Sequence, residues 1–284
     1  MAEILKGKPV ADAIKEELTS KIEDYKKKGV VAKVAILRVG ERPDDLSYEK
    51  RVLKNCEAIG MESQVVTLPE DCTQDDYLKA MKSLNDDPFV HGILAFRPLP
   101  KQIDAAVAAD SIAPEKDIDC MNPVTVSKLF FDDMSGNAPC TPEACIAVLK
   151  HYGYDLKGKN VVIVNRSMVL GRPLAMLFLH ENATVTICHS RTVDLPSVTR
   201  NADIVVTGIG RARFFGPEYF SEKNTVVDVG INAKPEGDGI CGDADFEKAE
   251  PIVSAITPVP GGIGTITSMI LLRHVVEGME RMVR

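Results

Sequence analysis

One stretch, residues 159–192, constrains the fold more than any other part of the chain. It opens with an apolar run at residues 161–164, passes through a polar loop into an apolar-periodic segment, and reaches a second β-rich run at residues 183–187. This is the order of a βαβ unit with two parallel strands. The loop lies where a strand ends and a helix begins, so unpaired N–H groups and the helix dipole favour an anion there. The stretch predicts an α/β domain that binds a phosphate-bearing ligand.

The loop lacks the G-x-G-x-x-G pattern of most dinucleotide-binding turns. Asn165, which tolerates turn geometry, and Gly171, which allows close approach of the backbone, stand in place of the missing glycines. On this signal alone, an ordinary βα turn of any α/β domain is an equal alternative.

The end of the second strand favours NADP over NAD. An NAD site usually has an acid there to bind the ribose 2′-hydroxyl, whereas an NADP site offers arginine to a 2′-phosphate. Here the residues are Cys188, His189, Ser190 and Arg191, with no acid. Residues 161–215 also contain six arginines, no lysine and only three acids, within a chain of net charge −7. A local positive site suits a small polyanion better than nucleic acid, although scattered surface arginines explain part of this pattern.

Composition is that of a globular protein in a reducing compartment. The 284 residues suffice for two modest domains. The first ten residues are too polar for a secretory signal, and no apolar run approaches the roughly 18 residues of a membrane helix. Seven cysteines form no C-x-x-C pair and no metal-like cluster with the five histidines. We expect a cytoplasmic protein with buried thiols, no metal and no membrane partner.

The remaining pattern alternates strands and helices. In the first half, helices are expected at residues 9–28, 47–59 and 73–85, the last with Thr73 as its cap, and strands at 31–39, 64–68 and 89–96. Proline-rich loops at 97–142 indicate crevice walls and a domain boundary. Thr141 is expected to cap a helix that runs to residue 152. Further strands are expected at 204–207, 225–229 and 252–255, and a last helix after the glycine-rich segment 257–267. This pattern predicts two α/β domains with a cleft between them.

Several motifs, taken in order, resemble one family, the methylenetetrahydrofolate dehydrogenase/cyclohydrolases of one-carbon metabolism. The resemblance covers nearly the whole chain. The motifs are Tyr48 in the second helix, RPLPKQID (97–104), PEKDID (114–119), PCTPE (139–143), NRSMVLGRP (165–173), ATVTICHSRT (183–192), DVGIN (228–232) and TPVPGGIG (257–264).

The resemblance implies a substrate-binding βαβ domain and a Rossmann-like NAD(P) domain, with tetrahydrofolate derivatives bound in the cleft between them, and a homodimer. We expect the folate-binding catalytic domain at residues 1–140, completed by the C-terminal helix at about 267–284, and the NAD(P) domain at 141–266. NADP is the expected cofactor and NAD the alternative, because arginines can also bind inorganic phosphate beside NAD.

The resemblance also assigns site residues by position. Tyr48 would stack on the aminobenzoate ring of folate and Asp119 would bind the pterin, which suits an aromatic face and a carboxylate. Without the resemblance, a loop or capping acid is the minority alternative for Asp119. The segment that would line the substrate consists of Pro260, Gly261, Gly262, Ile263 and Gly264. The dinucleotide would be contacted by Asn165, Arg166, Ser167, Ser190, Arg191 and Ile231.

Two positions depart from the family pattern. The family has lysine four residues after this tyrosine, where the chain has Val52, and glutamine where the chain has Phe96, with Arg97 in place of the following leucine. Arg51 lies near Tyr48 in direction but is too basic to exchange protons near neutrality. Hydride transfer depends mainly on alignment, whereas opening the methenyl cation with water requires proton relay. The sequence therefore predicts a dehydrogenase whose cyclohydrolase activity is lost or weak.

Three alternatives remain open. A bifunctional dehydrogenase/cyclohydrolase that uses another base is the nearest. A non-catalytic folate or nucleotide binding protein is the second, and a Rossmann dehydrogenase for another small substrate is the third.

Overall fold

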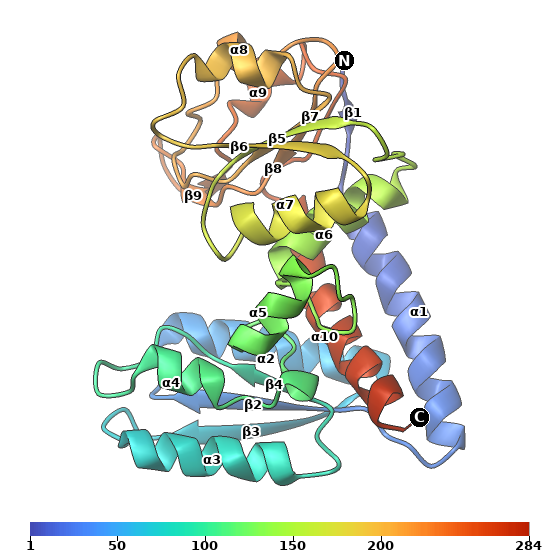
Figure 1. Cartoon of the computed structure of the whole chain (residues 1–284), viewed down its shortest axis with the longest axis vertical. Helices are drawn as coiled ribbons and strands as arrows, with labels where there is room; N and C mark the ends of the chain where they lie inside the picture. Colours follow the sequence, from blue (N-terminus) through green and yellow to red (C-terminus); the bar gives the residue numbers. More distant parts are fainter. Residues whose placement is uncertain (284) are drawn as a thin grey trace. The chain divides into compact units, whose positions relative to one another are not determined.

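The computed structural model describes residues 1–283, which form two compact units. The three-stranded unit comprises residues 13–138 and 268 onward, and the six-stranded unit comprises residues 1–12 and 139–267. Two long helices, α1 (Gly7–Lys27) and α10 (Ile263–Met282), begin in the six-stranded unit and continue in the three-stranded unit (Figure 1). The predicted fold class of two α/β domains with parallel sheets is confirmed.

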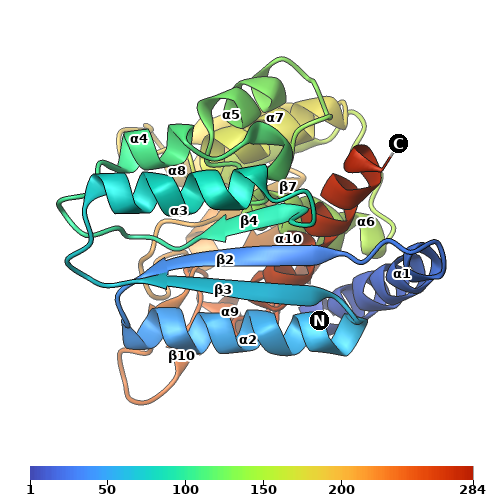
Figure 2. The same ribbon diagram turned by 90° about the horizontal axis from the view of Figure 1, so that it is seen from below.

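The three-stranded unit is a parallel sheet in the order β3-β2-β4. The strands are β2 (Lys33–Val39), β3 (Glu62–Leu68) and β4 (Gly92–Ala95). Besides α1 and α10, the helices are α2 (Pro43–Ile59), α3 (Gln74–Asp86), α4 (Ala105–Asp110), η1 (Pro114–Lys116) and α5 (Pro123–Phe130). Helices α2 and α3 lie on opposite faces of the sheet (Figures 1 and 2). This explains why β2 is an almost uninterrupted apolar run, since both of its faces are buried.

The core on one face shows how the sequence pattern produces this packing. Ala35 and Leu37 of β2 pack in one buried cluster with Tyr77 and Met81 of α3. Thr73 caps α3 as predicted: its hydroxyl accepts from the backbone N–H of Asp76, whose carboxylate accepts from the backbone N–H of Thr73.

The six-stranded unit is a sheet in the order β1-β11-β8-β7-β5-β6, with every pair parallel. Its elements are β1 (Glu3–Ile4), α6 (Cys140–His151), β5 (Asn160–Val164), α7 (Gly171–His180), β6 (Thr184–Cys188), α8 (Leu195–Arg200), β7 (Ile204–Thr207), η2 (Pro217–Tyr219), β8 (Thr225–Asp228), the hairpin β9 (Asn232–Ala233) and β10 (Ile240–Cys241), α9 (Phe246–Ala249) and β11 (Ala255–Ile256). Helices α6 and α7 cover one face, and α8 and α9 the other (Figure 1).

Three expectations require correction. The sequence placed residues 1–12 with the first domain, but β1 pairs with β11 and so belongs to the six-stranded unit. Thr141 is not a cap, because α6 begins one residue earlier and Pro139 occupies the N-cap position. The strand expected at 252–255 is only Ala255–Ile256, because residues 252–254 form the turn that follows α9.

Two buried carboxylates hold the loops at the carboxyl edge of the six-stranded sheet. Asp228, which ends β8, is 3% exposed and accepts backbone N–H groups of Gly230 (2.9 Å), Asp243 (3.1 Å) and Ala244 (2.8 Å). Asp243 is fully buried and accepts the backbone N–H groups of three consecutive residues, 209–211. Burial raises the pKa of Asp228 to about 6, although the N–H donors act in the opposite direction.

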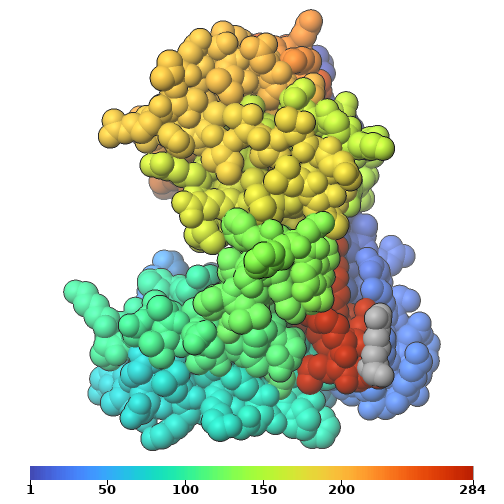
Figure 3. Space-filling model, viewed as in Figure 1, coloured from blue at the N-terminus to red at the C-terminus, as the bar shows by residue number. Residues whose placement is uncertain are grey.

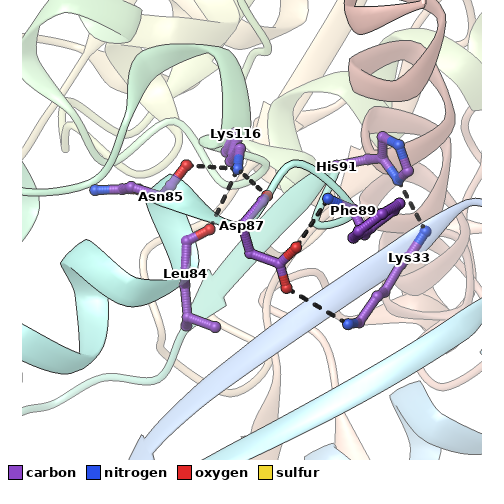
Figure 4. Close-up of polar contacts among 7 residues, drawn as sticks. All are labelled: Lys33, Leu84, Asn85, Asp87, Phe89, His91 and Lys116. Carbon is purple, nitrogen blue, oxygen red and sulfur yellow. Dashed lines mark hydrogen bonds and ion pairs between the residues drawn. The ribbon is translucent and has the colours of Figure 1, made fainter.

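A buried lysine fixes the loop that leads to Asp119. The side chain of Lys116 is 3% exposed, and Figure 4 shows its ammonium at the end of α3. It donates to the backbone carbonyl oxygens of Leu84 (3.2 Å), Asn85 (2.6 Å) and Asp87 (2.7 Å). A cation at a helix C-terminus is favoured by the helix dipole and satisfies carbonyls that the helix cannot. The hydrogen bonds of Lys116 therefore connect η1 to the C-terminal end of α3.

None of the helices within residues 1–283 is both long and apolar enough to cross a membrane.

The first prediction concerns Asp228. Its folded-state pKa lies above the ordinary value of 3.8, so it stabilises the fold below about pH 4, and this contribution is lost as pH rises through about 6. One pKa unit corresponds to about 1.4 kcal/mol. The free energy of unfolding of the wild type minus that of Asp228→Asn should therefore fall by a few kcal/mol between pH 4 and pH 7.

Urea unfolding at four pH values measures this difference. Asp12→Asn, at an exposed pair with Lys8, is the control, and its difference should change little. If the free energy of unfolding of the wild type minus that of Asp228→Asn grew with pH, the raised pKa of Asp228 would be contradicted.

The second prediction concerns Lys116. Lys116→Met keeps the volume but removes the donor of three carbonyl oxygens, one buried and two part-buried, so the free energy of unfolding should fall by about 3 kcal/mol. Lys82→Met removes an exposed pair with Asp86 and should cost less than about 0.5 kcal/mol. Equal losses in the two variants, measured by urea unfolding, would show that the ammonium contributes no more than a surface charge.

Candidate active site

Tyr48 lies on α2 near an aromatic ring and near a cation. The Phe96 ring centroid is 5.5 Å from that of Tyr48, with an interplanar angle of 35°. The guanidinium carbon of Arg51 is 5.4 Å from the same centroid. Tyr48 itself is half-buried. The site at this helix is therefore aromatic and cationic.

The two positions that depart from the family pattern are buried. Val52 is 1% exposed and lies on the same buried face of α2 as Cys56 and Ile59. Phe96 is 6% exposed and follows β4. Lys50 and Lys54 are exposed on other faces of the helix. An aliphatic and an aromatic side chain thus stand where the resemblance places an amine and an amide.

Asp119 lies in the same unit and pairs with Arg97. Its Oδ2 is 3.3 Å from Nη2 of Arg97, which directly follows Phe96. The loop around it is rigid, because the buried carboxylate of Asp117 accepts the backbone N–H groups of Met121 (3.0 Å) and Asn122 (2.8 Å). Asp117 is thus the structural acid of the PEKDID motif, and Asp119 is its half-exposed acid.

The residue after Asp119 is held in a costly backbone conformation. Cys120 has φ 53°, in the left-handed region that non-glycine residues rarely adopt. Such a conformation costs on the order of 1 kcal/mol and is kept where surrounding contacts determine it. The strain lies directly beside the candidate pterin-binding acid.

A buried ion pair that the sequence did not reveal connects β2 to α2. Arg38 Nε is 2.9 Å from Oε2 of Glu49, and both side chains are largely buried. The guanidinium also donates to Thr67 Oγ1 (3.2 Å) and to the carbonyl oxygen of Gly40. Glu49 is the neighbour of Tyr48, so the pair fixes the rotation of α2 that presents Tyr48. An arginine inside the apolar run of β2 was the signal that could have indicated this ion pair.

In the six-stranded unit, Asn165 organises the loop after β5 with its own side chain. Its Oδ1 accepts the backbone N–H of Ser167 (2.8 Å) and of Gly171 (3.0 Å), and its Nδ2 donates to the carbonyl oxygen of Gly208. A Cβ at Gly171 would lie 2.0 Å from the carbonyl oxygen of Asn165, so only glycine fits there. The side chain of Asn165 is therefore occupied within the protein, and residues 166–169, which include Arg166 and Ser167, are the exposed part of the loop.

A cavity of about 500 Å³ lies at the ends of β5, β6 and β7. Of the predicted cofactor residues, Asn165, Arg166, Ser167 and Ser190 line it. The sequence did not single out several other lining residues, which are His189, Leu195, Ile209, Arg211 and Phe214. The combination of an apolar floor, hydroxyl groups and two guanidinium groups suits a dinucleotide, with its planar base and its phosphates.

The other predicted residues lie elsewhere. Arg191 is exposed in the turn after β6, where its backbone N–H donates to His189 Nδ1 at 3.1 Å. Ile231 is 65% exposed, and a Cβ at Gly264 would lie 3.7 Å from its Cδ1. Pro260 to Gly264 belong to the six-stranded unit, whereas Tyr48, Val52, Phe96 and Asp119 belong to the three-stranded unit. Figure 3 shows the segment around α7, in yellow, on the molecular surface.

No group of three or more histidine, cysteine, aspartate or glutamate side chains among residues 1–283 is arranged to hold a metal ion.

Comparisons with known proteins identify the family of this chain. The family model "Tetrahydrofolate dehydrogenase/cyclohydrolase, catalytic domain" matches residues 5–119, and the model of the NAD(P)-binding domain of the same family matches residues 139–283. The protein named "Bifunctional protein FolD" of Clostridium botulinum (strain Hall) is 52% identical over 281 residues, which cover 99% of each chain.

Solved structures give the same result. The bifunctional enzyme FolD, methylenetetrahydrofolate dehydrogenase/cyclohydrolase, from Campylobacter jejuni has a TM-score of 0.95 at 40% identity, covering 99% of both chains. The Trypanosoma brucei methylenetetrahydrofolate dehydrogenase-cyclohydrolase, solved with NADP cofactor and inhibitor, has a TM-score of 0.91 at 34% identity, covering 100% of this chain and 99% of that chain. This chain therefore belongs to the tetrahydrofolate dehydrogenase/cyclohydrolase family and is an NAD(P)-dependent oxidoreductase.

Proposed function

We propose that this protein oxidises 5,10-methylenetetrahydrofolate with NADP and also hydrolyses the resulting 5,10-methenyltetrahydrofolate. The observation that carries the proposal is the match of 52% identity, over 99% of both chains, to a protein named bifunctional. The Campylobacter jejuni relative is likewise named a bifunctional enzyme. These names favour the bifunctional alternative over the prediction that hydrolysis is lost.

The choice of NADP is supported by the cavity in the six-stranded unit. NADP accepts a hydride when it is bound. Arg166, Ser167 and Ser190 supply donors for its phosphates, and the residues at the end of β6 include no acid that would repel a 2′-phosphate. The Trypanosoma brucei relative, solved with NADP, supports the same choice.

The folate substrate is assigned to Tyr48 and Asp119. The half-buried Tyr48 ring offers an apolar face to the aminobenzoate ring, and the carboxylate of Asp119 accepts N–H groups of the pterin. The ion pair with Arg97 orients that carboxylate before the substrate arrives. The glycine-rich segment Pro260 to Gly264 would supply backbone contacts to the substrate.

A second candidate function is a dehydrogenase without hydrolysis. Val52 and Phe96 favour it, because each is buried and neither can accept or donate a proton. Positioned acid-base groups contribute about 10² to 10⁴-fold to such steps. If hydrolysis does occur, the proton must pass through a group other than the family's lysine, and the Tyr48 hydroxyl is the titratable group already at this position.

The experiment that separates the two functions uses the wild-type protein. We expect added 5,10-methenyltetrahydrofolate to lose its absorbance faster with the protein than in buffer, and 5,10-methylenetetrahydrofolate to reduce NADP at 340 nm. Hydrolysis at the buffer rate, with intact NADP reduction, would exclude the bifunctional proposal and leave the dehydrogenase.

Restoring the family residues tests how much the missing amine matters. Val52→Lys combined with Phe96→Gln should raise the hydrolysis rate by at least about 10-fold, because a proton-exchanging amine returns to the face of α2 that carries Tyr48. Val52→Met with Phe96→Gln matches the length without the amine and is the control. If both double variants hydrolyse at the wild-type rate, the lysine position does not limit this enzyme.

A further inference from the structure

Arg211 lies over an aromatic ring in the cavity of the six-stranded unit. Its guanidinium carbon is 4.3 Å from the ring centroid of Phe214, and both residues line the cavity. Arg211 is exposed and Phe214 half-buried. The Phe214 ring is itself fixed, since its centroid is 5.0 Å from that of Phe215 at 83° and 5.7 Å from that of Tyr219. The guanidinium therefore has a rigid aromatic support on one face.

The backbone beneath Arg211 is equally fixed. The fully buried carboxylate of Asp243 accepts the N–H of Arg211 at 2.9 Å and that of Gly210 at 3.1 Å. The N–H of Phe214 in turn donates to the carbonyl oxygen of Arg211 at 3.3 Å. Arg211 thus leaves the end of β7 in one direction, which lowers the entropy lost when a ligand orders the side chain.

The surroundings of Arg211 suit a planar, uncharged group. Leu195 and Ile209 line the same cavity, and both pack against the apolar core of the unit. The groups that suit phosphates, Arg166 and Ser190, come from the ends of β5 and β6 instead. An aromatic base can stack on a guanidinium plane while the guanidinium remains on a phenyl ring.

We infer that Arg211, supported by Phe214, stacks on the adenine ring of NADP and is a cofactor-binding residue. This inference rests on the proposed use of NADP. Adenine is common to NADP and NAD, so Arg211 contributes affinity for both and does not discriminate between them. The adenine is also remote from the hydride, so Arg211 contributes to cofactor binding and not to the chemical step.

The test compares three variants of the full chain. Arg211→Leu removes the charged plane, and Arg211→Lys keeps the charge but not the plane. Arg213→Leu, two residues on, is the control, because Arg213 pairs with Glu236 and does not line this cavity. Isothermal titration measures NADP and NAD binding, initial rates give KM and kcat, and thermal unfolding verifies the fold.

Stacking predicts one pattern. Arg211→Leu and Arg211→Lys should each weaken NADP and NAD binding by about 10-fold, with KM for the cofactor rising and kcat unchanged. Arg213→Leu should stay within about twofold of the wild type.

Other outcomes overturn the inference in distinct ways. Recovery of affinity in Arg211→Lys, or a loss confined to NADP, would assign Arg211 to a phosphate. Unchanged NADP and NAD binding in Arg211→Leu would show that the contact between Arg211 and Phe214 contributes nothing to cofactor binding. A wild-type protein that binds neither nucleotide would overturn the proposed use of NADP and, with it, this inference.

Discussion

The carboxylate of Asp243 determines the shape of the nucleotide site. It accepts three consecutive backbone N–H groups, those of residues 209–211, and the side-chain amide of Asn232 at 2.8 Å. Without it, three part-buried N–H donors just after β7 would lose the acceptor that they share. The carboxylate of Asp228 in turn holds the backbone of Asp243, because it accepts the N–H of that residue. Two buried carboxylates therefore hold the loops of this sheet edge.

Asn165 performs the corresponding role in the loop after β5. In a G-x-G-x-x-G turn, glycines allow the backbone to approach both the phosphate and the next helix. Here one glycine, Gly171, allows the close approach, and the amide of Asn165 bonds both to the loop and to the carbonyl oxygen of Gly208 after β7. The Asn165 side chain thus takes the part that glycines have in the G-x-G-x-x-G turn. It also connects the ends of β5 and β7, which both border the cavity.

The sequence predicted most of the elements because their signals are local. The apolar run of β5 and the capping box of α3 each lie within a few residues. The contacts that complete the sites are not local. Asp243 reaches back 34 residues to Ile209, and Lys116 reaches back 31 residues to Asn85. Such pairings follow from the topology, so Arg211 and Phe214 were recognised only once the strand ends were placed together.

The Tyr48 site shows how one set of substitutions can affect two reactions unequally. Replacing an amine by Val52 and an amide by Phe96 removes proton carriers, yet it leaves an aromatic face and the Arg97 and Asp119 pair intact. Hydride transfer requires a substrate held in one orientation, and under the proposed assignment those contacts would supply it. Hydrolysis requires a proton to move, so under the proposed bifunctional activity the proton passes through a group other than Val52 and Phe96. The buried ion pair of Arg38 and Glu49 contributes to orientation in the same way. Burying the two charges costs desolvation free energy, but the pair fixes α2 and therefore the position of Tyr48.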